Sequence, residues 1–202
     1  LGEKTRYYNL HIKGMSNLHS DERPVPVFAL GIALSTRGSD HLRSRAVIDL
    51  FNLPKDFLKE YYGFDTVNDY SAYETKGKVV WFHETYYPIA DCLSVCRVAT
   101  NSFSPNRMGF QDYADLIWTI TGMKFTPAEL QQIGERIYTI ERLFNIREGA
   151  GRKDDYPCER YFVEPTPAGF PKNRNKKLDR EKFDMMIDEN YAMHGWDKNG
   201  VP

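Results

Sequence analysis

The segment Ile89–Cys96 carries a carboxylate and a thiol close together, because Asp91 and Cys96 stand five positions apart in an apolar stretch. One interpretation is a buried core cysteine, since free cysteine is among the most buried residue types, with Asp91 as a local cap near Pro88. The other is a lone cluster ligand, supplied far in the sequence from a CxxC-type group. The spacing leaves both interpretations open.

His41 follows the turn-forming residues 38–40 and is flanked by Arg37 and Arg43. This pattern favours the start of a helix, with His41 in the first turn. The functional alternative is an imidazole beside a redox or acid–base centre, where a pKa near neutrality allows proton exchange. The guanidinium groups on either side suit phosphate recognition.

The other histidines and the cysteine count indicate structural roles. Three cysteines, an odd number, argue against a disulfide framework in a chain of cytoplasmic character. No remaining histidine has a partner at metal-ligand spacing, so four are predicted to be structural: His11, His19, His83 and His194. Charged residues at 141–142 and 153–155 are predicted to form salt bridges and caps.

Composition bounds the class of protein. At 202 residues and 41% hydrophobic content, the chain can form one domain or two small ones. The net charge of -1 comes from 27 basic and 28 acidic residues that are interspersed, which argues against binding to nucleic acid or to an anionic membrane. No apolar run approaches the roughly 18 residues of a membrane span.

Hydrophobic periodicity predicts a mainly α fold. Weak strand signals occur only at residues 7–12 and 24–28. Pro88 should kink or divide the second of five expected helices, which cover residues 54–62, 76–98, 110–121, 127–148 and 180–194.

Caps and apolar faces define the last three helices. Thr126 to Glu129 form a capping box with proline at the first helical position, Asp179 is an N-cap, and residues 152–177 read as an extended segment. The inward faces are expected to be Phe110, Tyr113, Ile117 and Ile120, then Leu130, Ile133, Ile137, Ile140 and Phe144, and finally Phe183, Met186, Ile187 and Tyr191.

Several motifs resemble those of a known family. Asp21-x-Arg23, Gly31 and Arg37-Gly38-x-x-His41 are similar to the D-P-R-G…G-x-x-x-x-x-R-G-x-x-H segment of the tungsten-containing aldehyde:ferredoxin oxidoreductase family, and the run from Asp91 to Cys96 resembles its D-x-x-G-L-C motif. Residues 134–165 resemble its GERI…ERLFN…G…DD…P…EP signature, and residues 191–197 its terminal YY-x-x-RGW. The motifs keep the family's order from about residue 21 to 202.

The resemblance implies a role for each of five residues. Cys96 would be the fourth ligand of a [4Fe-4S] cluster and would link that cluster to a pterin ring. Asp91 and the backbone near Val95 would hold one of two metallopterins in a bis-pterin tungsten (or molybdenum) site. His41 would face the substrate side of the metal as a proton donor or acceptor, and Arg43 matches a basic position that contacts the cofactor.

Three departures from the family pattern affect this site. Ser94 stands at the glycine of D-x-x-G, where glycine allows close backbone approach. Residues 24–26 are Pro-Val-Pro where family members have glycines, and Asp40 precedes His41 in place of a cysteine or small residue. These changes suggest a divergent branch with an altered substrate pocket. The active subunit of ATP-independent benzoyl-coenzyme A reductase belongs to such a related branch.

The resemblance covers the C-terminal helical region, residues 1–202, with a sub-boundary expected near residues 100–125. The family's upstream CxxCxxxC triple, its first pterin motif and its N-terminal β domain are absent from this sequence. A chain of these residues alone is therefore expected to be inactive.

The implied partners are the rest of its own polypeptide, ferredoxin or another iron–sulfur carrier, and an aldehyde or aromatic thioester; homo-oligomerisation stays open. The contrasting hypothesis is a non-catalytic helical scaffold.

Overall fold

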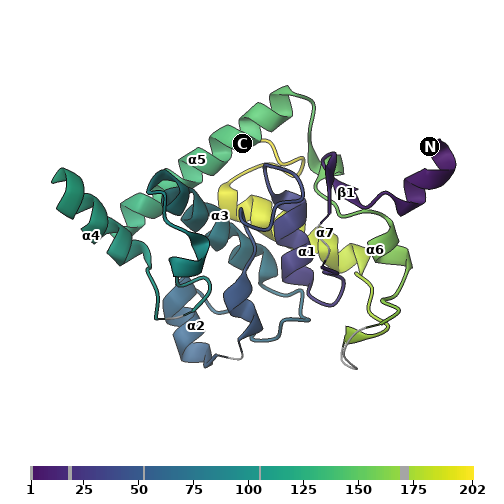
Figure 1. Ribbon diagram of the computed structural model, residues 1–202, viewed down its shortest axis with the longest axis horizontal. Helices are drawn as coiled ribbons and strands as arrows, with labels where there is room; N and C mark the ends of the chain where they lie inside the picture. The colour runs from purple at the N-terminus through teal and green to yellow at the C-terminus, as the bar shows by residue number, and fades with distance from the viewer. Residues whose placement is uncertain (1, 18–19, 52, 105, 169–172) are drawn as a thin grey trace.

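The computed structural model describes residues 2–17, 20–51, 53–104, 106–168 and 173–202, and in this part of the chain it is mainly helical (Figure 1). The mainly α prediction is therefore confirmed. The α-helices are α1 (Pro26–Leu34), α2 (Lys55–Tyr62), α3 (Lys76–Cys92), α4 (Phe110–Thr121), α5 (Pro127–Arg147), α6 (Arg160–Val163) and α7 (Arg180–His194). Short 3-10 helices are η1 (Glu3–Tyr8), η2 (Val47–Leu50), η3 (Arg97–Ala99) and η4 (Arg152–Asp154), and the antiparallel pair β1 (His11–Ile12) and β2 (Met15–Ser16) forms a small hairpin.

Helix α3 is the centre of the body and packs most extensively against α5 and α7, with α1 also against it (Figure 1). Two glycines allow these close contacts. A Cβ atom at Gly134 of α5 would lie 1.8 Å from the backbone oxygen of Thr85, and one at Gly77 of α3 would lie 2.4 Å from the backbone oxygen of Met186. Any side chain at either position would push the helix backbones apart.

The predicted caps of the late helices are confirmed. The hydroxyl of Thr126 accepts a hydrogen bond from the backbone N–H of Glu129, and the Glu129 carboxylate accepts one from the backbone N–H of Thr126, at 3.2 and 2.8 Å. The Asp179 carboxylate accepts from the backbone N–H of Lys182 at 3.1 Å. All four inward residues predicted for α7 are buried.

The prediction of a helix over residues 76–98 was wrong at its end, and the division considered at Pro88 does not occur. Helix α3 stops at Cys92, and Pro88 lies inside it without dividing it. Helix α3 continues through Pro88 because that part of it is enclosed by its neighbours, so tertiary packing outweighs the lost backbone hydrogen bond. The helix ends where Ser94 turns into the left-handed conformation, at φ 55°.

The strand predictions near the N-terminus hold only for His11 and Ile12, which form β1, and are wrong elsewhere. Residues 3–8 form η1, and the segment 24–28 leads into α1, which begins at Pro26. Every residue of α1 is buried. A helix enclosed on all sides has no polar face, so its sequence lacks the alternation of apolar and polar residues that would reveal its period.

The apolar faces of α4 and α5 are only partly used. The buried positions of α5 are Leu130, Gly134, Tyr138 and Arg142, while Ile140 is 65% and Phe144 54% exposed. Ile120 of α4 is 72% exposed, and α4 projects from one edge of the body (Figure 1). The predicted faces were therefore right for their first residues and wrong for Ile120, Ile140 and Phe144.

The buried Arg142 belongs to an ion pair that the sequence analysis expected in this region. Its guanidinium Nη1 lies 2.7 Å from the carboxylate of Asp155, whose other oxygen lies 2.8 Å from Lys13 Nζ. Asp155 is fully buried. The segment after α5 is mostly irregular as predicted, although η4 and α6 interrupt it. Among the described residues, no helix has the length and apolarity needed to span a bilayer.

Candidate functional site

Asp91 lies in the last turn of α3, between two arginines from other segments. Its Oδ2 is 2.6 Å from Nη1 of Arg43, and its Oδ1 is 2.7 Å from Nη2 of Arg97. Both guanidinium groups are buried, whereas the Asp91 side chain is 44% exposed. The two arginines orient the carboxylate, and part of it remains exposed to solvent.

Arg43 has a second carboxylate partner on α5. Its Nε donates to Oε2 of Glu141 at 3.1 Å, and Nη2 contacts the other oxygen of the same carboxylate. Burial by itself would lower the pKa of Arg43, but the hydrogen bond to Glu141 and the nearby negative charges hold that pKa above its usual value. Arg43 therefore joins the turn that follows α1 to both α3 and α5.

The loop after α3 carries the candidate thiol. Backbone N–H groups of Ser94 and Val95 donate to the backbone oxygens of Asp91 and Ala90, at 3.0 and 2.8 Å, and this pair of bonds is a Schellman motif. The left-handed residue of such a motif is usually glycine. This preference explains why the resembling family motif has glycine at the position that Ser94 occupies here. Val95 packs partly against the core.

Cys96 is exposed, in extended backbone at φ -64° and ψ 135°. The interpretation of Cys96 as a buried core cysteine is therefore wrong. Cys92, in the last turn of α3, is exposed as well. The helix end separates Asp91 from Cys96, so the two side chains do not share a helical face.

Arg97, which the sequence analysis did not single out, ties this loop to the turn at residues 41–44. Its Nε donates to the backbone oxygen of Leu42 at 3.0 Å, and its guanidinium carbon lies 4.4 Å from the ring centroid of Tyr87. Only its place directly after Cys96 in an otherwise apolar run could have drawn attention to it.

His41 lies in a turn and not at the start of a helix, so the helical prediction for it was wrong. The turn is held by the Asp40 carboxylate, which accepts from the backbone N–H of Leu42 at 2.8 Å and pairs with Arg37 at 2.9 Å. Partial burial and then the charge of Arg45 lower the pKa of His41, so its ring is neutral at pH 7. Within the described ranges the ring makes no hydrogen bond, and no hydrogen bond or ion pair joins it to Asp91 or Cys96.

The donor set fits part of a metal site. No group of three or more histidine, cysteine, aspartate or glutamate side chains that could hold a metal ion occurs among the residues described. An exposed thiol beside a half-exposed carboxylate and two buried guanidinium groups nevertheless suits a single thiolate ligand next to an anionic cofactor. The other ligands of such a centre would have to come from another segment.

His194 lies between two carboxylates on different helices. Its Nε2 is 2.9 Å from Glu84 of α3 and its Nδ1 is 2.5 Å from Glu135 of α5, while Glu135 also accepts from the indole N–H of Trp81 at 2.9 Å. Burial would lower the pKa of His194, but the hydrogen bonds and charges of both glutamates raise it to about 8. The structural role predicted for His194 is thus an ionic link among α3, α5 and α7.

The remaining histidines are also outside the candidate site. His83 is fully buried, and burial lowers its pKa to about 3. His11 is an exposed strand residue, and His19 lies outside the described residues.

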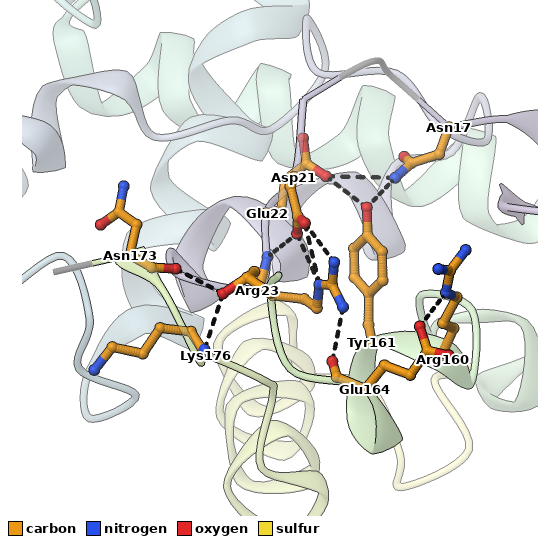
Figure 2. Close-up of polar contacts among 10 residues, drawn as sticks. Asn17, Asp21, Glu22, Arg23, Arg160, Tyr161, Glu164, Asn173 and Lys176 are labelled. Atoms are coloured by element: carbon orange, nitrogen blue, oxygen red, sulfur yellow. Dashed lines mark hydrogen bonds and ion pairs between the residues drawn. The ribbon is translucent and has the colours of Figure 1, made fainter. Parts of the chain in front are cut away.

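The Asp21-x-Arg23 motif braces the chain before α1 against α6 (Figure 2). Arg23 pairs with Asp21 at 2.6 Å and donates from Nη1 to the backbone oxygen of Glu164 at 2.7 Å. The hydroxyl of Tyr161 donates to the buried Glu22 at 3.2 Å. Two motifs far apart in the sequence therefore meet in one polar cluster that is separate from Asp91 and Cys96 in its contacts.

Comparison with known proteins finds relatives that carry the same name in different organisms. The tungsten-containing aldehyde ferredoxin oxidoreductase of Pyrococcus furiosus is 27% identical over 181 residues, which are 89% of this chain and 27% of that protein. The enzyme of the same name from Thermococcus kodakarensis is 26% identical over 194 residues, 96% of this chain and 29% of that one. The chain thus spans little more than a quarter of the length of these curated relatives.

A solved structure shares the fold. It is the active site complex BamBC of benzoyl coenzyme A reductase in complex with 1,5 dienoyl-CoA, with a TM-score of 0.50 and 22% identity, and the match covers 66% of this chain and 18% of that one. The sequence family described as aldehyde ferredoxin oxidoreductase, domains 2 and 3, matches residues 1–202. The chain therefore belongs to the aldehyde ferredoxin oxidoreductase family.

Proposed function

We propose that this chain is the C-terminal helical region of a tungsten or molybdenum bis-pterin oxidoreductase that also holds a [4Fe-4S] cluster. The whole protein would oxidise aldehydes to carboxylic acids in the cytoplasm and pass the electrons to ferredoxin or a similar carrier. The remainder of the polypeptide would complete the site and is the first partner of this region. The residues of this chain alone would be inactive.

The observation that carries the proposal is the arrangement around Asp91. Its carboxylate and the exposed Cys96 thiol belong to one ordered helix end, which buried Arg43 and Arg97 attach to the rest of the chain. A non-catalytic scaffold does not require an exposed thiol next to two buried cations. Even paired buried cations add little to stability, because the cost of removing them from water offsets the attraction, so such an arrangement supports a function.

Each residue of the candidate site would have its own role in binding the cofactors. Cys96 would ligate the cluster, Asp91 and the backbone near Val95 would bind one pterin, and Arg43 would contact the cofactor while orienting Asp91. When bound, the metallopterin would supply the two-electron chemistry, and the protein would supply orientation and charge.

His41 would handle protons. Oxidation of an aldehyde to a carboxylic acid takes its added oxygen from water and releases two electrons and two protons. Because burial and Arg45 lower the pKa of His41, its ring is neutral near pH 7 and can accept one of these protons. The ring is half-buried and makes no hydrogen bond within the described chain, so it could pass this proton on to solvent.

A benzoyl-coenzyme A reductase-type reaction is the alternative. The shared fold of the BamBC complex supports it, and so do the departures at Ser94 and at residues 24–26. The same cofactor-binding residues would serve it, with an aromatic thioester in place of an aldehyde. The substrate therefore has to be found by assay.

The test uses the full-length protein from a host that makes the cofactor. Tungsten, molybdenum, pterin and iron would be quantified, and the reduced protein examined by EPR, in the wild type, in Cys96→Ser and in the matched control Cys92→Ser. We expect a [4Fe-4S] signal and stoichiometric metal in the wild type and the control, and a lost or altered signal in Cys96→Ser. Metal-free wild-type protein would instead favour the scaffold. Loaded protein would then be offered aldehydes and aromatic coenzyme A thioesters in parallel.

A further inference from the structure

Arg97 makes contacts to three separate points from one side chain. It donates from Nε to the backbone oxygen of Leu42, lies against the ring of Tyr87, and pairs through Nη2 with Asp91. Leu42 belongs to the turn that carries His41, and the other two contacts are on α3. Because Arg97 directly follows Cys96, these contacts also fix the backbone position of that cysteine.

Arg97 is buried with hydrogen-bond donors that the described surroundings leave unused. The residue is 6% exposed, and Asp91, its carboxylate partner among the described residues, is shared with Arg43. The contact between Nη2 and Asp91 is an ion pair that is not aligned as a hydrogen bond, and Nη1 has no hydrogen-bond partner among the described residues. A buried donor without a partner destabilises the fold, so stability alone would not favour this arrangement.

The position of this charge relates it to the candidate site. A buried cation with spare donors lowers the energy of negative charge nearby. The loop at residues 93–96, which would carry the cluster thiolate, is where negative charge would accumulate on reduction. The ring of Tyr87 keeps the guanidinium in place through a cation–π contact, so the charge does not swing out to solvent.

We propose that Arg97 is a positioning residue for the cofactor site, which holds the Cys96 loop against the His41 turn and supplies a fixed positive charge that favours the reduced cluster. The proposal rests on the proposed function, because it assumes that Cys96 ligates the cluster. It assigns to Arg97 two separable effects, one geometric and one electrostatic. The geometric effect needs the contact to Leu42, and the electrostatic effect needs only the charge.

The test compares full-length Arg97→Gln and Arg97→Lys with the wild type, with Arg147→Gln as the control. Arg147 is an exposed residue at the end of α5 that pairs with its neighbour Glu148, so its replacement removes the same charge away from these contacts. The readouts are the midpoint potential of the cluster by EPR-monitored titration, the pterin content per chain, and the midpoint of thermal unfolding.

We expect Arg97→Gln to shift the cluster potential to more negative values and to lower pterin content, both beyond the change in Arg147→Gln. Arg97→Lys should keep the potential close to the wild type but still lose pterin, since one ammonium group cannot hold Leu42 and Asp91 together. Arg97→Gln protein with wild-type potential and pterin content would overturn the proposal. If that variant does not fold, full pterin content in Arg97→Lys would overturn it. A wild-type protein without a cluster would refute the proposed function itself.

Discussion

Replacement of His194 tests whether one buried cation sets the pH dependence of stability in this chain. The imidazolium joins Glu84 and Glu135, and its pKa rises from 6.5 to about 8 on folding. One pKa unit corresponds to about 1.4 kcal/mol, so protonated His194 contributes about 2 kcal/mol to the free energy of unfolding.

The sign follows from the direction of the pKa change. A group whose pKa is raised on folding stabilises the native state fully below its unfolded pKa, here 6.5, and loses that contribution as pH rises through its folded pKa. Most of the 2 kcal/mol should therefore disappear between pH 6.5 and about 9.5. His83 acts in the opposite direction, because burial lowers its pKa to about 3, but it destabilises the fold only below the unfolded histidine pKa of about 6.5.

The assay is urea unfolding at intervals from pH 6.5 to pH 9.5, on the wild type, His194→Arg and His194→Gln. Arginine keeps its charge throughout this range, and glutamine has none, so both variants should lose the decline attributed to His194, whatever their absolute stabilities. His11→Gln serves as the control, since His11 is exposed, and it should keep the wild-type slope. A wild-type slope equal to that of His194→Gln would refute the reasoning.

Three further substitutions test a close helix contact, a left-handed residue and a helix cap. Gly134→Ala should lower the free energy of unfolding by about 2 kcal/mol, because its Cβ would meet the backbone oxygen of Thr85. The control is Gly151→Ala, where the new Cβ would have open space around it. Equal stabilities of the two variants would contradict the close helix contact. Ser94→Gly should raise stability by about 1 kcal/mol by relieving a left-handed serine, and a loss of stability on thermal unfolding would argue against it. Thr126→Ala should lower the free energy of unfolding by about 1 kcal/mol through the lost cap, measured by the shift in urea midpoint. No shift would show that the cap does not stabilise the fold.

Local chemistry made parts of the fold predictable from the sequence. The termini of α5 and α7 could be predicted because Thr126 and Asp179 act through neighbours three residues away, so the signal is contained in a short window. Where the outcome depended on distant packing, prediction failed. Continuity of α3 through Pro88 and the exposure of Ile140 depend on which surfaces other helices cover, and no local pattern reports that.

The candidate site divides in the same way. Asp91 and Cys96 could be singled out by residue type, but their separation by a helix end depends on the left-handed Ser94, a conformation more typical of glycine. The partners of Arg43 lie 48 and 98 positions away in the chain. Arg97 was missed because its value comes from contacts to Leu42 and Tyr87, which exist only in the folded chain.

The complete burial of α1 has a consequence for how the chain is made in the cell. Its nine residues have no polar side to show to water, and the helices that enclose it include α3 and α7. Helix α7 begins at Arg180, so at about 5–20 residues per second α1 waits roughly 7 to 30 s for its last partner to be synthesised. During that interval the segment Pro26–Leu34 is an exposed apolar stretch on a nascent chain, which makes it the natural place for a chaperone to bind.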